Sequence, residues 1–197
     1  MPGDIKYKDL NKDGSINGDD RTRDNDLYSQ TPEIVYGFGL NAEWKGWFVG
    51  VFFQGVAHTS TNLMASYGNI MPFLIGFDKG SARTMLNDRW RPEDPYNQNV
   101  LFPRMHSSAF VHNTEYASTW WYRDGGFLRL KNVEIGYEFN KKKLSKYKLN
   151  NLRVYLQGTN LAVWDHVKYW DPELGNASSG AVYPLERTFS LGLEVTF

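Results

Sequence analysis

The chain has 197 residues, its 22 basic and 22 acidic side chains cancel, and 16% of its residues are aromatic. The charge balance removes the overall field that would favour nucleic acid, and the lack of Cys excludes disulfide scaffolds and cysteine nucleophiles. No apolar run is long enough for a transmembrane helix, and the opening "MPGDIKYKDL" lacks the features of a signal peptide. Transmembrane strands stay possible, because each needs only about 9–11 alternating residues.

Residues 1–32 are polar and turn-rich, and they contain the acidic run "DLNKDGSINGDD" at 9–20. Oxygen-bearing side chains occupy alternate positions of this run, and Gly14 at the sixth position permits a sharp turn. Calcium prefers six to eight hard oxygen ligands, so we expect a structural Ca²⁺ site, with an acidic turn that holds no ion as the alternative. The expected ligands are Asp9, Asn11, Asp13, Ser15 (through its carbonyl) and Asp20.

Five later segments alternate between apolar residues and small or polar ones, which is the period of a β-strand. They cover residues 34–44, 47–57, 127–139, 152–164 and 187–197. A tight Lys45-Gly46 turn predicts a hairpin from the first two. The connection 58–126 has no sustained period, apart from a short helix expected over 81–90 with Ser81 as its N-cap. A basic turn (140–151) and a further loop (165–186) separate the remaining strands.

The last segment alternates most regularly, and the printed chain stops at its final aromatic residue. Outer-membrane β-barrels end on such a strand, which serves as the recognition signal for the insertion machinery. We expect that signal to consist of Phe189, Leu191, Leu193, Val195 and Phe197.

A soluble β-sandwich would show the same alternation with its apolar faces turned inward. Three observations favour a membrane barrel. The polar faces carry Gly, Asn, Gln, Thr and Glu instead of many lysines, and aromatic residues such as Tyr36 and Trp44 stand at strand ends. The long connections also fall on one side of the sheet and the short turns on the other. Because closing a barrel takes about eight strands, we expect a C-terminal portion of a longer protein in which Met1 is not the natural start.

Several motifs in order resemble the C-terminal end of SusC/RagA-type TonB-dependent outer-membrane transporters. They are "GDIKYKDLNKDGSINGDDR", "PEIVYGFGLNAEWKGWFVGVFFQG", "RWRPEDP", "GFLRLKNVEIGYEF", "LRVYLQGTNLAVW", "YWDPE" and "YPLERTFSLGLEVTF". The resemblance implies an all-β, antiparallel up-and-down transmembrane barrel in the cell outer membrane, contributed here by about five strands with long extracellular loops. It further implies import of glycans, oligosaccharides or peptides, a SusD-like lid lipoprotein, and TonB acting through a region missing here. Residues 1–32 would be an extracellular loop segment and 33–197 the strands and loops of the barrel.

No residue pattern points to catalysis, so we do not expect an enzyme. The histidines, at 58, 106, 112 and 166, lack metal-ligand spacing. A cluster of rings could stack on sugars, although interfacial or loop packing is favoured: Trp120, Trp121, Tyr122, Trp164, Tyr169 and Trp170. The alternative function is a secreted calcium-dependent carbohydrate-binding β-sandwich.

Overall fold

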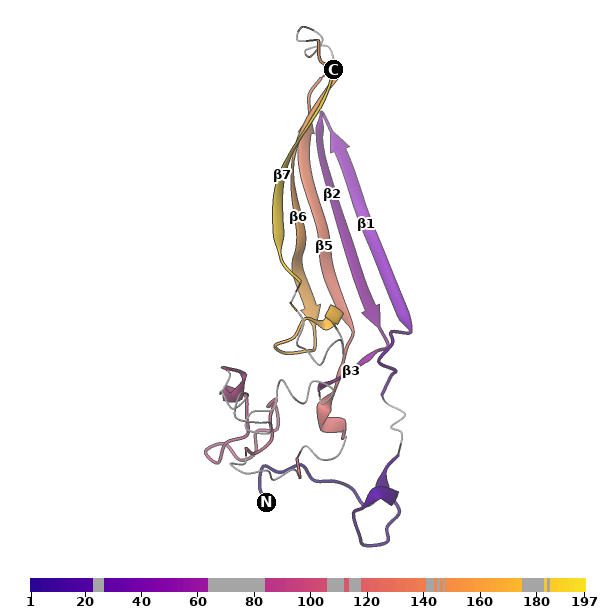
Figure 1. Ribbon diagram of the computed structural model, residues 1–197, viewed down its shortest axis with the longest axis vertical. Helices are drawn as coiled ribbons and strands as arrows, with labels where there is room; N and C mark the ends of the chain where they lie inside the picture. Colours follow the sequence, from indigo (N-terminus) through magenta and orange to yellow (C-terminus); the bar gives the residue numbers. More distant parts are fainter. Residues whose placement is uncertain are drawn as a thin grey trace. The chain divides into compact units, whose positions relative to one another are not determined.

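The computed structural model describes residues 1–22, 27–63, 84–105, 112–113, 118–140, 144, 146, 148–174, 183 and 185–197. Its main feature is an antiparallel five-stranded sheet in the order β1-β2-β5-β6-β7 (Figure 1). The strands are β1 (Ile34–Trp44), β2 (Trp47–Ala57), β5 (Phe127–Glu138), β6 (Asn151–Asp165) and β7 (Thr188–Thr196). The all-β antiparallel prediction is therefore confirmed, and each strand boundary agrees with the sequence-based one to within a residue.

Each strand pairs with the strand that follows it in the sheet, so the chain runs up and down. The β1–β2 turn places Lys45 at φ 50° and Gly46 at φ 91°. Two positive φ values define the tight two-residue turn whose twist matches that of paired strands. The predicted hairpin is therefore present, and the strand order leaves β1 and β7 at the edges of the sheet.

One irregularity interrupts the ladder at Lys131 of β5, which is skipped both in the pairing of β5 with Phe52 and Phe53 of β2 and in its pairing with β6. Such a bulge adds a residue to one strand and changes which of its side chains share a face. The apolar residues of β5 accordingly change from even to odd numbers across the bulge, from Leu130 to Val133. The alternation on each side continues, so the sheet keeps two distinct faces.

The chain divides into two compact units, each described here by itself. The sheet unit comprises residues 32–58, 126–166 and 184–197, and the loop unit comprises residues 1–31, 59–125 and 167–183. The division into 1–32 and 33–197 that we expect from the sequence stays a prediction. Among the described residues, no helix is both long and apolar enough to cross a membrane.

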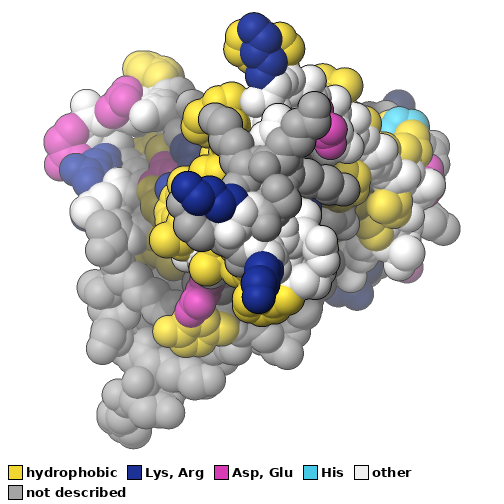
Figure 2. Space-filling view, turned by 90° about the horizontal axis from the view of Figure 1, so that it is seen from above, with side chains coloured by type: hydrophobic (Ala, Val, Ile, Leu, Met, Phe, Trp, Pro, Cys, Tyr) yellow, Lys and Arg dark blue, Asp and Glu magenta, His cyan; other side chains and the backbone are white. Residues whose placement is uncertain are grey.

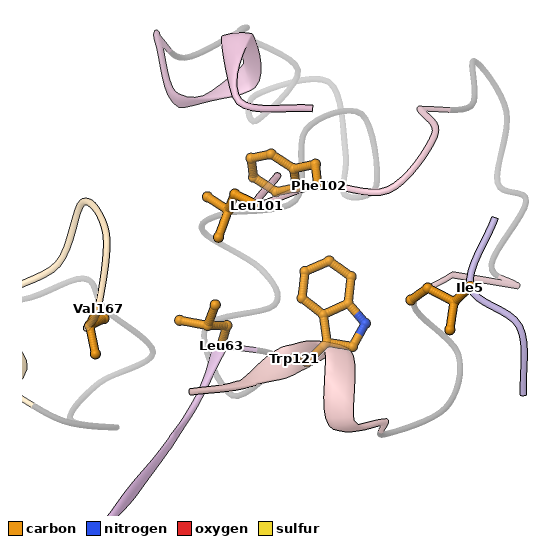
Figure 3. Close-up of a cluster of buried hydrophobic side chains, with 6 residues drawn as sticks. All are labelled: Ile5, Leu63, Leu101, Phe102, Trp121 and Val167. Atoms are coloured by element: carbon orange, nitrogen blue, oxygen red, sulfur yellow. The ribbon is translucent and has the colours of Figure 1, made fainter. Parts of the chain in front are cut away.

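The loop unit has a small hydrophobic core of its own, drawn in Figure 3. Its members come from distant segments: Ile5, Leu63, Leu101, Phe102, Trp121 and Val167. The loop unit also contains short elements: η1 (Gly18–Asp20), β3 (Ser60–Asn62) paired with β4 (Tyr122–Asp124), η3 (Thr84–Asn87), η4 (Thr119–Trp121) and η6 (Pro172–Leu174). The helix expected over 81–90 is the four-residue 3-10 turn η3, and Ser81 lies outside the described residues.

Candidate functional site

One face of the sheet is apolar from edge to edge. The register places Leu40 beside Val51 and Val51 beside Val133. The same face carries Tyr36, Phe38, Ala42, Trp44, Trp47, Val49, Phe53, Leu128, Leu130, Ile135, Tyr137, Leu152, Val154, Leu156, Ala162, Trp164, Phe189, Leu191, Leu193 and Val195. Leu40 is 74% and Leu191 79% exposed. A soluble sandwich buries such a face against a second sheet, whereas a membrane barrel leaves it to lipid.

The opposite face of the sheet is polar. Its register pairs include Asn41 with Gly50, Gln54 with Arg129 and Gln157 with Ser190. Phe48 and Phe52 also lie on this face, since they pair with Glu43 and Gly39. This placement explains the mixed pattern of residues 47–57, where phenylalanines of the polar face alternate with valines of the apolar face.

Aromatic rings on the polar face lie flat against glycines of neighbouring strands. A Cβ atom at Gly37 would approach the Phe52 ring to 3.0 Å, and one at Gly136 or Gly192 would overlap the ring of Phe48 or Tyr155. Glycine therefore leaves the space that each ring fills. Cross-strand pairs of this kind stabilise sheets, because the ring on one strand packs over the glycine of the next.

A charged residue completes this packing near the β1–β2 turn. The Arg153 guanidinium lies 3.9 Å from the centroid of the Phe48 ring and 5.5 Å from that of Tyr155. It also forms an ion pair with Glu134. Contacts of a cation with ring faces and with a carboxylate hold the guanidinium against the sheet.

Aromatic residues stand at both ends of the apolar face. Near the β1–β2 turn, the rings of Trp47 and Tyr137 are 5.2 Å apart edge to face, and Phe139 lies 5.0 Å beyond Tyr137. At the other end, the Tyr36 hydroxyl donates a hydrogen bond to the Phe127 carbonyl at 3.0 Å. This distribution is typical of the two interfacial girdles of a membrane barrel.

The residues expected to form the insertion signal share one face, as the alternation predicts. Phe189, Leu191, Leu193 and Val195 lie on the apolar side of β7, and Phe197 follows the strand. All of them are exposed. Their role in insertion stays a prediction.

The acidic run 9–20 folds into a loop closed by its own side chains. Asp9 accepts backbone N–H groups from Lys12 at 2.6 Å and Gly14 at 2.9 Å. Asp20 accepts from Leu10 at 2.7 Å and Asn17 at 2.8 Å, which ties the last position of the run to its beginning. Gly14 has φ 85°, as expected for the sharp turn.

The donor chemistry of this loop suits a hard cation. The Asp13 carboxylate accepts hydrogen bonds from the Ser15 amide at 2.7 Å and from the Asn11 side chain at 3.0 Å. Each carboxylate retains lone pairs after these bonds, and calcium prefers such oxygens. In the part of the chain that the structure describes, no three His, Cys, Asp or Glu side chains are already gathered around a metal position. The expected ligand set therefore stays a prediction.

The backbone donors also change the acidity of Asp20. Hydrogen bonds from the amides of Asn17 and Leu10 lower the pKa of its carboxyl below the ordinary 3.8. The donors stabilise the charged form, which is the form that a cation requires.

The start of the loop unit is held by a polar network that the sequence did not indicate. Arg104 donates two hydrogen bonds to the Asp4 carboxylate, at 3.0 and 2.9 Å, and Asn113 donates a third at 3.2 Å. The Asn113 side chain also accepts the Ile5 amide at 2.8 Å. These partners are about a hundred residues apart in sequence, so no local pattern could have revealed them.

The clustered rings mainly serve packing. Trp121 is 0% exposed and donates its indole N–H to the Asn113 carbonyl, and Trp120 donates to the Leu101 carbonyl at 3.1 Å. Trp170 packs on the same core, whereas Trp164 and Tyr169 are exposed. An open groove of about 1100 Å³ in the loop unit is lined in part by Tyr7, Tyr28, Trp90, Trp120 and Tyr122.

Two of the described histidines, His58 and His112, have separate partners. His58 Nδ1 lies 3.5 Å from Glu33 Oε2, and His112 Nε2 lies 2.9 Å from the Ile5 carbonyl. His106 and the sequence Asn176-Ala-Ser178 lie outside the described residues. Among the described residues, no histidines are gathered into a group that could hold a metal ion.

Comparison with known proteins places these features in context. The chain is 30% identical to TonB-dependent receptor P26 and 29% identical to TonB-dependent receptor P3, both of Formosa agariphila, over 99% and 100% of its length. It is also 34% identical to TonB-dependent receptor SusC of Bacteroides thetaiotaomicron, over 42% of its length. No protein-family model matches it. The chain spans about a fifth of the first two relatives, 20% and 19%.

Solved structures show the same arrangement of strands. The chain matches the RagAB peptide importer in its open-open state with a TM-score of 0.65 and 25% identity, over 93% of this chain and 19% of that one. The closed-closed state gives a TM-score of 0.65 at 24% identity. These relatives are named receptors and importers, and none of their names is that of an enzyme.

Proposed function

The chain belongs to the TonB-dependent receptors of the SusC/RagA type, and we propose that it supplies part of the wall and the outer loops of an outer-membrane nutrient importer. The observation that carries the proposal is the apolar face that crosses all five strands with a polar face behind it. Lipid is the environment that suits the apolar face, and a water-filled or plugged lumen suits the polar one.

The orientation of the sheet follows from its connections. The β1–β2 turn and the β5–β6 turn leave one end of the sheet, while the segments that make up the loop unit leave the other. Outer-membrane barrels have short periplasmic turns and longer extracellular loops. The loop unit is therefore extracellular in this proposal, and the Lys45-Gly46 turn is periplasmic.

The partners and cargo of the importer follow from the same relationship. A SusD-like surface lipoprotein would cap the extracellular side, and TonB would drive import through a part of the receptor outside this chain. A glycan, an oligosaccharide or a peptide is the proposed cargo. The groove in the loop unit, lined by aromatic and polar side chains, supports contact with such a molecule or with the lid.

A calcium ion in the loop 9–20 would have a structural role. Asp9, Asn11, Asp13 and Asp20 would supply side-chain oxygens and Ser15 a carbonyl. The ion would hold the start of the loop unit in one conformation, since metal binding is coupled to local folding. Titration calorimetry with Ca²⁺ tests this role, with an Asp9→Asn/Asp13→Asn variant as the loss-of-site partner. Equal heats from both proteins would show that these carboxylates do not bind calcium.

Import itself is tested in cells that depend on the receptor. Cells that carry the intact receptor should accumulate a labelled cargo, and cells that lack either the receptor or TonB should not. The intact receptor should also sediment with the outer membrane and require detergent for extraction. A protein that stays in solution without detergent and binds glycan as a monomer would instead support the secreted sandwich.

A further inference from the structure

The end of the sheet that carries the β1–β2 and β5–β6 turns has a concentration of basic residues. The β5–β6 turn contains Lys141, Lys142, Lys143, Lys146 and Lys148, and no acidic residue occurs between 139 and 152. Lys146 and Lys148 are described by the structure and are exposed, as is Lys45 in the neighbouring β1–β2 turn. We call Lys45, Lys146 and Lys148 the basic end of the sheet.

The turn that carries these lysines is fixed to the strands at its base. The Phe139 amide donates to the Leu152 carbonyl at 3.0 Å, and the Asn150 amide donates to the Thr196 carbonyl at 2.7 Å. Leu144 inside the turn is buried. The described lysines therefore project from an anchored segment just beyond the strand ends.

Lys45, one residue of the basic end, borders the aromatic residues of the apolar face. Lys45 Nζ lies 4.5 Å from the centroid of the Trp44 ring, and Trp47, Tyr137 and Phe139 continue the aromatic edge. Figure 2 looks onto this end and shows Lys and Arg side chains beside hydrophobic ones. Aromatic belts lie at headgroup depth in a membrane, and lysines next to them extend toward the phosphates.

The acidic side chains of the strands at this end of the sheet are on its other face. Glu43 pairs with Phe48 on the polar face, and Glu138 and Glu194 both pair with Arg153. Lys45, Lys146 and Lys148 form no ion pair with another described residue. These lysines are therefore not neutralised by the described carboxylates of the polar face.

We propose that the basic end binds the headgroups of anionic phospholipids, which would fix this edge of the barrel at the membrane surface. The inference rests on the proposed function, because it takes the apolar face to be in lipid. Lysines near an anionic surface attract it within a Debye length. The position of Lys45 at the aromatic edge favours a lipid headgroup over an acidic protein, which would not need the apolar neighbour.

Local quenching measures this preference in the intact receptor. A fluorophore attached at Asn150→Cys reports on lipids near the turn, and the bilayer contains nitroxide-labelled phosphatidylglycerol or nitroxide-labelled phosphatidylcholine at equal mole fraction. We expect phosphatidylglycerol to be enriched about threefold or more at low salt. The enrichment should approach one in the Lys45→Gln/Lys146→Gln/Lys148→Gln variant. The matched control Lys6→Gln/Lys8→Gln/Arg91→Gln, which removes as many charges from the loop unit, should retain it.

The outcomes separate the two proposals. Equal quenching by both lipids in the unmodified receptor would overturn lipid binding while leaving membrane insertion intact. If both lipids quench equally and an acidic protein binds to the basic end instead, the lysines would be assigned to that protein. This result would also overturn the lipid proposal. Absence of quenching by either lipid would show that the receptor is not inserted, and would contradict the proposed function as well.

Discussion

At the scale of single residues, Asp4 places a buried carboxylate in the loop unit. Its carboxylate is 8% exposed and accepts two hydrogen bonds from Arg104 and one from Asn113. Replacing Asp4 with Asn leaves the guanidinium without its charge partner and should destabilise the loop unit by about 2–3 kcal/mol. Hydrogen exchange should then accelerate at the Ile5 and Arg104 amides, whereas the exposed Glu93→Gln control should not change them. Unchanged exchange in Asp4→Asn would contradict the network's role.

Asp20 gives the acidic loop a predicted pH dependence. Because backbone donors lower its folded-state pKa below 3.8, its contribution is fully present above about pH 4 and is lost as pH falls through the lowered folded value. The Leu10 and Asn17 amides, corrected for intrinsic exchange, should therefore keep their protection down to about pH 4 and lose it at lower pH. Asp20→Asn should lower their protection at neutral pH and flatten the profile, while Asp19→Asn should behave like the parent. A parent profile without pH dependence would contradict this assignment.

The residues of the acidic loop could be predicted from the sequence, whereas those of the Asp4 network could not. The acidic loop could be predicted because its oxygens and Gly14 follow one another at fixed spacing along the chain. The Asp4 network could not, since Arg104 and Asn113 reach Asp4 only through folding of the loop unit. A short polar residue before "IKY" carries no signal of a partner so distant.

At the scale of elements, alternation was sufficient to predict every long strand, because period 2 is the direct consequence of strand geometry. The short strands β3 and β4 could not be predicted in this way, because three residues are too few to show an alternation. Nor could the bulge between Leu130 and Asn132, which depends on the partner strand. The ring–glycine pairs are also invisible along one strand, because Phe48 and Gly136 belong to different ones.

The Phe48–Gly136 pair makes a prediction for β5. Gly136→Ala would push a methyl group into the Phe48 ring and against the Val154 carbonyl oxygen, and overpacking of this kind typically costs about 1–3 kcal/mol. The refolded receptor should therefore unfold at a lower denaturant concentration. Adding Phe48→Ala removes the obstructing ring and should recover part of the loss. A double variant less stable than either single variant would show that the ring and the glycine do not share one space.

Strand β7 allows a comparison between adjacent residues on opposite faces. Leu191 lies on the apolar face and Ser190 on the polar face. Arginine facing lipid near the middle of a bilayer costs about 2–4 kcal/mol, so Leu191→Arg should reduce the folded fraction in vesicles. Ser190→Arg should be tolerated. Heat-modifiable migration on gels reports the folded fraction, and equal loss in both variants would speak against two chemically distinct faces.

At the scale of the whole molecule, the chain combines a sheet unit suited to a membrane with a loop unit that has its own hydrophobic core. The sheet unit exposes large apolar residues such as Leu40 and Leu191, whereas the loop unit buries Phe102 and Trp121. This difference explains why composition alone was ambiguous: the same aromatic content serves lipid contact in one unit and packing in the other. Sequence periodicity predicted the first use and packing was the favoured reading of the second, but only the structure identifies which rings the loop unit buries.

The most direct test of the account asks which side of β7 touches lipid. This chain has no Cys, so once any Cys elsewhere in the intact receptor is replaced, single Cys substitutions at residues 188, 189, 190, 191, 193 and 194 can each carry a spin label in bilayers. Accessibility to oxygen, which enriches in lipid, should be high at residues 189, 191 and 193 and low at 188, 190 and 194. Accessibility to a water-soluble nickel reagent should be lower at the odd positions than at the even ones. Profiles without alternation, or with the opposite alternation, would contradict the assignment of the apolar face to the membrane.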